Sequence, residues 1–175
     1  MSTATLKVAP TLMPVNNELL AAAVSAAESA FGMCGVTTRC VGASAVPVRD
    51  SGMITGLIGV HGKVSGFISV NFPERAAVHA VSSLLGEKFA ALNAQVVDGV
   101  GEITNMITGG IKSALADSKW AFSQITVPSV IVGRGYSIAY AKGLTFLSIT
   151  FEHDDSEAML LEDRLIQIHI SLLTL

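Results

Sequence analysis

Hydrophobic residues recur at helical spacing in three parts of the chain. The first pattern covers about 16–32, where either Asn16 or Asn17 can cap the helix N-terminus. The second covers about 73–86, with a proline at its start and a glycine at its end, as helix boundaries often have. The third occupies 93–117 and is the longest. The periodicity therefore predicts three helices.

Six further runs show the alternation of apolar and polar residues that is typical of β-strands. A tight turn at residues 61–63 joins two of these runs, which predicts an antiparallel hairpin. In the second arm of the hairpin, Ser69 and Asn71 alternate with apolar residues, so we expect both to face solvent. The six predicted strands cover 36–46, 53–61, 63–72, 125–133, 144–151 and 164–174.

The order of the predicted elements indicates an internal duplication. A helix and three strands are followed by a linking helix, and then by another helix and three strands. This order predicts an α+β fold, in which six antiparallel strands form one sheet and the helices pack on one of its faces. Residues 1–14 are interrupted by two prolines and are expected to form an N-terminal arm. Residues 15–175 are expected to form a single domain.

The stretch 93–117, NAQVVDGVGEITNMITGGIKSALAD, separates into two faces when it is read at 3.6 residues per turn. One face is an ordinary apolar core stripe. It comprises Val96, Val100, Ile103, Ile107 and Ala114, with Val97 and Ile111 beside them. The opposite face is polar and carries Asp98, Glu102, Asn105, Gly109 and Lys112.

The polar face of this helix is unusual for a surface that meets only water. Asparagine costs roughly 0.5 kcal/mol and glycine about 1 kcal/mol relative to alanine in a helix interior, yet this face includes Asn105 and borders the pair Gly109-Gly110. A docking partner would explain these residues, because Glu102 and Asn105 project together and Gly109 lets a partner approach the backbone. Two simpler interpretations stay open. The polar residues are also consistent with a solvated pair, and the glycines with close helix packing or a bend.

Composition narrows the class of protein. Half of the 175 residues are hydrophobic and 14% are charged, which is enough for one large core and leaves a surplus that favours a buried subunit interface. The net charge of −3 and the absence of any basic run argue against nucleic-acid binding. No apolar segment is long enough to span a bilayer and no signal peptide is visible. We therefore expect no membrane insertion and a cytoplasmic location.

Metal-dependent and nucleophile-triad chemistry are not indicated. Cys34 and Cys40 match no zinc or redox motif, and we expect both to be buried free thiols. The histidines show no ligand spacing, so we expect each at the surface or at a strand edge. They are His61, His79, His153 and His169.

Residues 98–115, DGVGEITNMITGGIKSAL, resemble the signature of the CheC/CheX/FliY family of response-regulator phosphatases. That signature is a Glu-x-x-Asn motif on a long helix, which this chain matches with Glu102 and Asn105. In CheX-like members the motif stands in a context similar to GE-x-x-N-M-I-x-G, and this chain reproduces it. The stretches 56–77 and 128–135 are also similar to the family. The resemblance extends from the first predicted helix to the last predicted strand.

The resemblance is to the single-site CheX type. CheC-like members carry a second Glu-x-x-Asn on the first helix, but here Glu18 and Glu28 are followed three residues later by Ala21 and Phe31. The CheX type implies a homodimer whose sheet is continuous across the two subunits. The apolar surplus of the chain agrees with that expectation.

The activity implied by the resemblance is hydrolysis of the aspartyl phosphate on a CheY-like receiver domain. The receiver would supply Mg²⁺ and a lysine of its own, and this chain would bind no cofactor. Asn105 would hold a water in line with the breaking P–O bond, while Glu102 would pair with the receiver's lysine. Gly109 would give the partner clearance, with Asp98 and Lys112 at the rim of the contact.

The alternative is a non-catalytic binding module of the same fold. Relatives of this fold serve as structural parts of the flagellar switch, and a shared fold does not establish a shared function. Such a chain would bind a response regulator without accelerating the loss of its phosphate.

Overall fold

The computed structural model describes residues 15–47, 52–134, 136, 138 and 143–174, so the predicted arm at 1–14 lies outside the described residues. The helices are α1 (Asn17–Met33), α2 (Glu74–Leu85) and α3 (Ala94–Ala114), and a short 3-10 helix, Leu161–Arg164, precedes the last strand. The strands are β1 (Thr38–Ser44), β2 (Ile54–Gly62), β3 (Val64–Phe72), β4 (Phe122–Ile125), β5 (Ser129–Val132), β6 (Thr145–His153) and β7 (Leu165–Thr174).

These strands form one antiparallel sheet, as the sequence predicts. Its order is β1-β6-β7-β3-β2-β4, and β5 also pairs with β2. The sheet has seven strands rather than six because β4 precedes the predicted run 125–133 and overlaps it only at Ile125, whereas β5 lies within that run. β4 ends at Ile125 and β5 begins at Ser129, and Pro128 between them has no N–H to donate to a continuous ladder.

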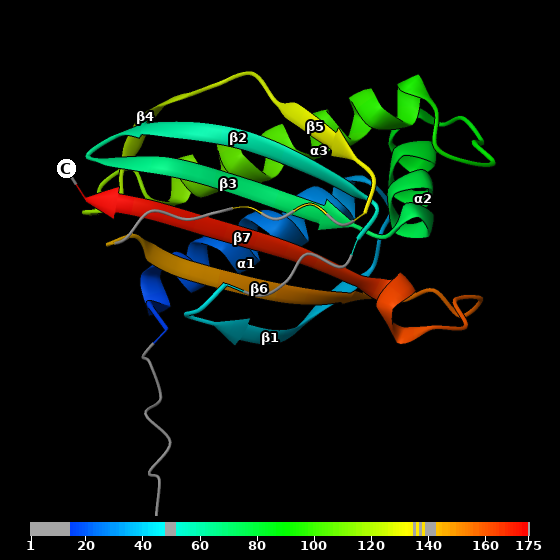
Figure 1. The fold of residues 1–175 in the computed structure, drawn as a ribbon, viewed down its shortest axis with the longest axis horizontal. Coiled ribbons are helices and arrows are strands. Elements are labelled where there is room, and N and C mark those ends of the chain that lie inside the picture. Colours follow the sequence, from blue (N-terminus) through cyan, green and yellow to red (C-terminus); the bar gives the residue numbers. More distant parts are fainter. Residues whose placement is uncertain (1–14, 48–51, 135, 137, 139–142, 175) are drawn as a thin grey trace, which may run out of the picture.

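The helices α1 and α3 lie side by side behind the sheet, and α2 stands at one end of it (Figure 1). This arrangement confirms the predicted α+β class. No helix in the described part of the chain is long and apolar enough to cross a bilayer. Alternate residues of the central strands face α1 and α3, and each fully buried aliphatic side chain contributes roughly 1.5–3 kcal/mol to stability. One cross-strand row of this core is Ile58, Ile68, Ile170 and Leu147.

The opposite face of the sheet is also buried at its centre, which contradicts the expectation that Ser69 and Asn71 face solvent. Both side chains have no exposed surface. The Asn71 carboxamide accepts a hydrogen bond from the Gly52 N–H at 2.7 Å, and it donates to the Thr55 hydroxyl at 2.6 Å and to the Tyr136 hydroxyl at 3.2 Å. Parts of the chain that are remote in sequence therefore cover this face. Alternation separates two faces of a strand but does not say which face meets water.

The packing of α3 is closest where glycines remove a side chain. A methyl group placed on Gly110 of α3 would lie 2.8 Å from the Ala26 Cβ of α1. On the side of α3 that faces the sheet, a methyl group on Gly56 of β2 would lie less than 2.5 Å from the Thr104 hydroxyl of α3. The Thr104 hydroxyl donates a hydrogen bond to the Val100 carbonyl at 2.7 Å, so the buried hydroxyl is not an unsatisfied donor. The backbone of α3 is thus held tightly between α1 and the sheet.

The predicted core stripe of α3 is confirmed for its valines and isoleucines but not for its last member. Ala114 is exposed, whereas Ile111 and Leu115 are buried. The helix ends at Ala114, with Leu115 as its cap residue, so the stretch 116–117 is not helical. The core stripe turns slightly around the helix toward its C-terminus.

Two neighbouring glycines of α3 give a matched test of this packing. Alanine at Gly109 meets no atom within 4 Å, so Gly109→Ala should gain up to about 1 kcal/mol of helix propensity. Gly110→Ala gains the same propensity but must displace α1, at a cost of about 1–3 kcal/mol. Urea unfolding should therefore rank the Gly110→Ala protein about 1–3 kcal/mol below the Gly109→Ala protein. Equal stability of the two variants would contradict the close contact.

Candidate functional site

The outer face of α3 presents the residues that the sequence singled out. Asp98 and Glu102 are exposed, and Asn105, Gly109 and Lys112 are partly exposed. The structure thus brings all five onto one side of a single helix, away from α1 and the sheet. Among the described residues, the groove that includes Lys112 of this face is shallow, and such a form suits a macromolecular partner better than a small ligand.

The helix that carries this face is anchored at its start and along its length. The Asn93 carboxamide caps the N-terminus by accepting a hydrogen bond from the Val96 N–H at 2.9 Å. Behind the outer face, the side chains of Ile103 and Ile107 are fully buried. A rigid helix matters because residues three apart keep their relative positions only while the backbone between them stays helical.

The side chains of Glu102 and Asn105 are free to meet a partner. Neither side chain makes a hydrogen bond or ion pair to any other residue that the structure describes. A carboxylate and a carboxamide one turn apart offer three kinds of contact from one small area: charge, hydrogen-bond acceptance and hydrogen-bond donation. This arrangement can bind a cation and orient a water molecule at the same time.

The two glycines of the pair Gly109-Gly110 fit different interpretations, one of close helix packing and the other of clearance for a docking partner. Gly110 serves helix packing, because it lies directly against Ala26. At Gly109, no atom of the described residues lies within 4 Å of where a side chain would begin, so packing among those residues does not require glycine there. The open space above Gly109 lies one turn beyond Asn105 on the outer face.

A shallow groove continues this face at the C-terminal end of α3. It has a volume of about 550 Å³ and includes Lys112 together with Lys63 from the β2–β3 turn. The Lys63 ammonium donates to the Ser118 carbonyl at 3.2 Å, which holds it beside the end of α3. The outer face therefore runs from acidic at Asp98 and Glu102 to basic at its other end. Sequence reasoning missed Lys63, since its proximity depends on the tertiary fold.

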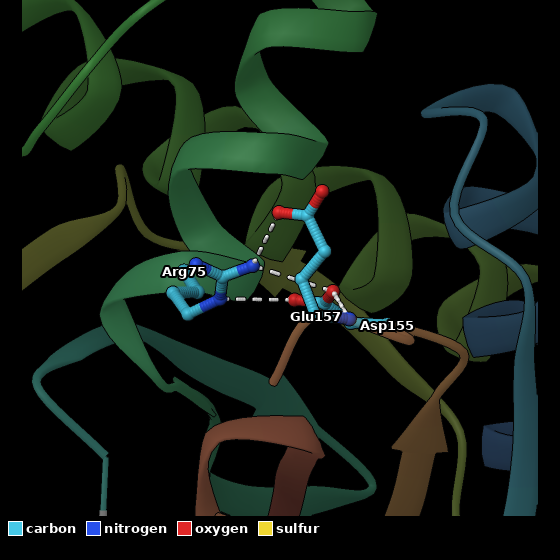
Figure 2. A network of polar contacts seen from close by, with 3 residues as sticks. All are labelled: Arg75, Asp155 and Glu157. Carbon is cyan, nitrogen blue, oxygen red and sulfur yellow. Dashed lines mark hydrogen bonds and ion pairs between the residues drawn. The ribbon is translucent and has the colours of Figure 1, made fainter. Parts of the chain in front are cut away.

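Helix α2 supports the N-terminal half of α3. A methyl group on Gly99 would lie 2.5 Å from the Val81 side chain of α2, so the two helices touch at the turn that also carries Asp98 and Glu102. The start of α2 is tied to the loop after β6 by an ion-pair network (Figure 2). Arg75 donates to Asp155 at 3.0 Å and 3.3 Å and to Glu157 at 3.4 Å. The Arg75 guanidinium lowers the pKa of the Asp155 carboxyl below its ordinary value.

A larger groove, of about 750 Å³, lies beside this network and not on the outer face of α3. His79 of α2 and His153 at the end of β6 both line it, and their ring centroids are 5.2 Å apart. His153 is buried, and its Nδ1 makes no hydrogen bond within the described residues. Burial, followed by the proximity of His79, lowers the pKa of His153. Acidic and basic side chains are mixed around this groove, including Lys88, Asp155 and Glu157.

Two expectations about the histidines and cysteines are wrong. His153 and His169 are buried rather than superficial, and the His169 ring shares a 2.9 Å hydrogen bond with the Ser148 hydroxyl. Cys40 is exposed on β1, while Cys34 is buried and has a pKa raised to about 11 by that burial. Within the described ranges, no group of three or more His, Cys, Asp or Glu side chains is arranged to hold a metal ion.

Comparison with known proteins points to one family. The model of the family described as chemotaxis phosphatase CheX matches residues 54–152. Chemotaxis protein CheX from Vibrio vulnificus is 30% identical, with 89% of this chain and 97% of that one covered and a TM-score of 0.70. CheX from Desulfovibrio desulfuricans is 26% identical over 89% and 99% of the two chains, with a TM-score of 0.74.

A third similar structure is that of the CheX–CheY–BeF3–Mg²⁺ complex from Borrelia burgdorferi. It is 21% identical over 89% of this chain and 96% of that chain, with a TM-score of 0.67. At this identity the likeness shows the fold alone. A search of curated protein sequences found no significant match.

The groups that join α2 to the loop after β6 predict that the protein is sensitive to acid. The pKa values of His153 and Asp155 are both lowered in the folded state. Each group therefore contributes fully to the free energy of unfolding at a pH above its ordinary pKa. That contribution is lost as the pH falls through the pKa that the group has in the folded state. For His153 the loss should begin below its ordinary value of 6.5. Melting temperatures should fall between pH 7 and pH 5, and His153→Gln should flatten that dependence. His61→Gln, at an exposed position, is the control, and an unchanged slope in His153→Gln would contradict the assignment.

Proposed function

Because this chain belongs to the CheX family of chemotaxis phosphatases, we propose that it dephosphorylates the phospho-aspartate of a CheY-like receiver domain. The observation that supports this proposal is the pair Glu102 and Asn105, whose side chains lie on the outer face of a long helix and bond to no other residue that the structure describes. A relative from Borrelia burgdorferi forms a complex with CheY, BeF3 and Mg²⁺, which supports the class of partner.

The proposed reaction needs little covalent chemistry from this chain. An aspartyl phosphate is an activated acyl phosphate, and attack by one water on phosphorus breaks the bond between phosphorus and the aspartyl oxygen. The products are the aspartate carboxylate and inorganic phosphate, which keeps the two hydrogens of the water or passes one to solvent. Catalysis then consists mainly of placing that water in line with the breaking bond.

Asn105 is the group proposed to place the water. Its carboxamide oxygen accepts a hydrogen bond and its nitrogen donates one, so it can orient a water on both sides. An amide carries no charge and is therefore not captured by the cations that surround the phosphoryl group. The position of Asn105 depends on α3, and a displacement of about 1 Å in such a group can cost roughly a hundredfold in rate.

Glu102 is proposed to set the register of the complex. Its carboxylate would form a charge-assisted hydrogen bond with the lysine of the receiver's active site. Asp98 and Lys112 flank this contact at the rim, and the open space over Gly109 leaves room for the partner's backbone. Mg²⁺ would be held by the receiver, and this chain would contribute no metal ligand.

A homodimer and a cytoplasmic location stay predictions. The edge strand β1 supports the dimer, because among the described strands it pairs with β6 alone and most of its residues are exposed. Val41 on this strand is 46% exposed, so a partner strand paired with this edge would also cover apolar surface. Light scattering coupled to size exclusion measures the mass directly, and a monomer at micromolar concentration would contradict the dimer.

The catalytic proposal predicts different effects for the two motif residues. Asn105→Ala should return hydrolysis to the receiver's own rate while largely sparing binding, because only the water loses its partner. Glu102→Ala should lower both activity and affinity, the latter by roughly tenfold to a hundredfold for a lost charged hydrogen bond. Phosphate release from a phosphorylated receiver measures the first effect, and titration with the beryllofluoride-activated receiver measures the second.

Glu87→Ala, on the exposed loop after α2, is a control that should change neither measurement. Wild-type activity in the Asn105→Ala protein would show that the water is not positioned by this residue. Binding of the receiver by the wild-type chain without any acceleration would select the alternative, a non-catalytic binding module.

A further inference from the structure

The edge of the sheet is interrupted beside α3. β4 ends with Ile125 opposite Val60, and β5 begins with Ser129 opposite Leu57. Between these two pairs, the edge carries the three residues 126–128 where β2 has only two. One extra residue on one strand is the definition of a β-bulge, which bends the strand and redirects side chains.

The bulge is held firmly between the sheet and the helix. The Thr126 N–H donates to the Gly59 carbonyl at 2.9 Å, and the Gly59 N–H donates to the Thr126 hydroxyl at 2.9 Å. The ring of Pro128 then lies against α3, where a methyl group on Gly101 would be 3.4 Å from the Pro128 Cβ. These contacts leave Val127 at the tip, with 83% of its surface exposed.

The bulge contacts the turn of α3 that carries the proposed catalytic pair, because Pro128 lies against Gly101. Gly101 directly precedes Glu102 in the sequence, and it lies one helical turn before Asn105 on the same side of α3. Figure 1 shows the linker between β4 and β5 running along the outer edge of β2, while α3 lies behind the strands β2 and β3. Val127, an apolar β-branched side chain with few rotamers, is thus exposed on a segment that packs against the turn of α3 carrying Glu102.

We propose that Val127 is an apolar docking contact for the phosphorylated receiver domain. This inference rests on the proposed function and adds a residue outside the motif to it. On docking, Val127 would be buried against the receiver and would keep bulk water away from the contact made by Glu102. Shielding of this kind strengthens a charged hydrogen bond that is otherwise open to solvent.

Protection of the sheet edge is the simpler explanation of a bulge, but it does not account for the valine. Edge strands are commonly blunted by prolines, charged residues and bulges. Pro128 and the bulge already provide that protection here. A valine at the exposed tip adds nothing to that protection, whereas a charged residue at the same position would.

The test compares Val127→Ser with Val132→Ser. Val132 is on β5, in the same edge, and is 51% exposed, so it controls for the loss of an exposed valine. Val127→Ser should weaken binding of the beryllofluoride-activated receiver by about tenfold, as expected for one valine side chain buried on docking. It should raise KM for the phosphorylated receiver by a similar factor and change kcat far less. Val127→Ile should bind at least as well as the wild type, and Val132→Ser should match the wild type.

Melting temperatures of both serine variants should equal that of the wild type, which shows that neither acts by unfolding the edge. Wild-type affinity in Val127→Ser, or an equal loss in Val132→Ser, would overturn the inference. A wild-type chain that binds the activated receiver without hastening phosphate loss would refute the phosphatase proposal alone, and the affinities would then still decide the role of Val127. A wild-type chain that binds no CheY-like receiver from its own organism would refute both.

Discussion

The close packing of α3 against α1, α2 and the sheet is the constraint on which the rest of this structure depends. At Gly56, Gly99 and Gly110 a neighbouring side chain occupies the space that a Cβ would need. The sheet, α2 and α1 therefore each touch α3 more closely than helices with ordinary side chains allow. Only the outer side of the helix is left for Glu102 and Asn105. Such close packing favours a site that must position one water molecule, because a tightly packed backbone keeps the side chains of the site in place.

The same constraint explains why the proposed site is a ridge and not a cavity. The larger groove lies between α2 and the loop after β6, and it contains the buried His153 and the Arg75 ion pairs. Those groups act on stability, since they fasten α2, which in turn touches α3 at Gly99. Outside α3 itself, the bulge between β4 and β5 exposes Val127, and Lys63 adds a basic group at the C-terminal end of the helix. Such a projecting, mixed surface suits recognition of another folded domain.

Much of the fold was predictable from the chain itself. Helical and alternating periodicities identified the helices and the antiparallel sheet, because the spacing of apolar residues must match the backbone period of each element. The outward placement of Glu102 and Asn105 followed from the same periodicity. Pro128 signals an interruption in the run 125–133, but the bulge itself was not predictable, since it is stabilised by Thr126 and Pro128 contacting remote parts of the fold.

The sequence by itself determined which residues share a face, since that depends only on local geometry. Only the tertiary structure decided what each face meets. Asn71 alternates as a solvent-facing residue would, yet its carboxamide is enclosed by hydrogen bonds to Gly52, Thr55 and Tyr136. Gly109 and Gly110 are neighbours in the chain, but Ala26 lies against Gly110, whereas no described residue comes within 4 Å of a Cβ placed on Gly109. Burial is a property of contacts between distant segments, and no local pattern contains it.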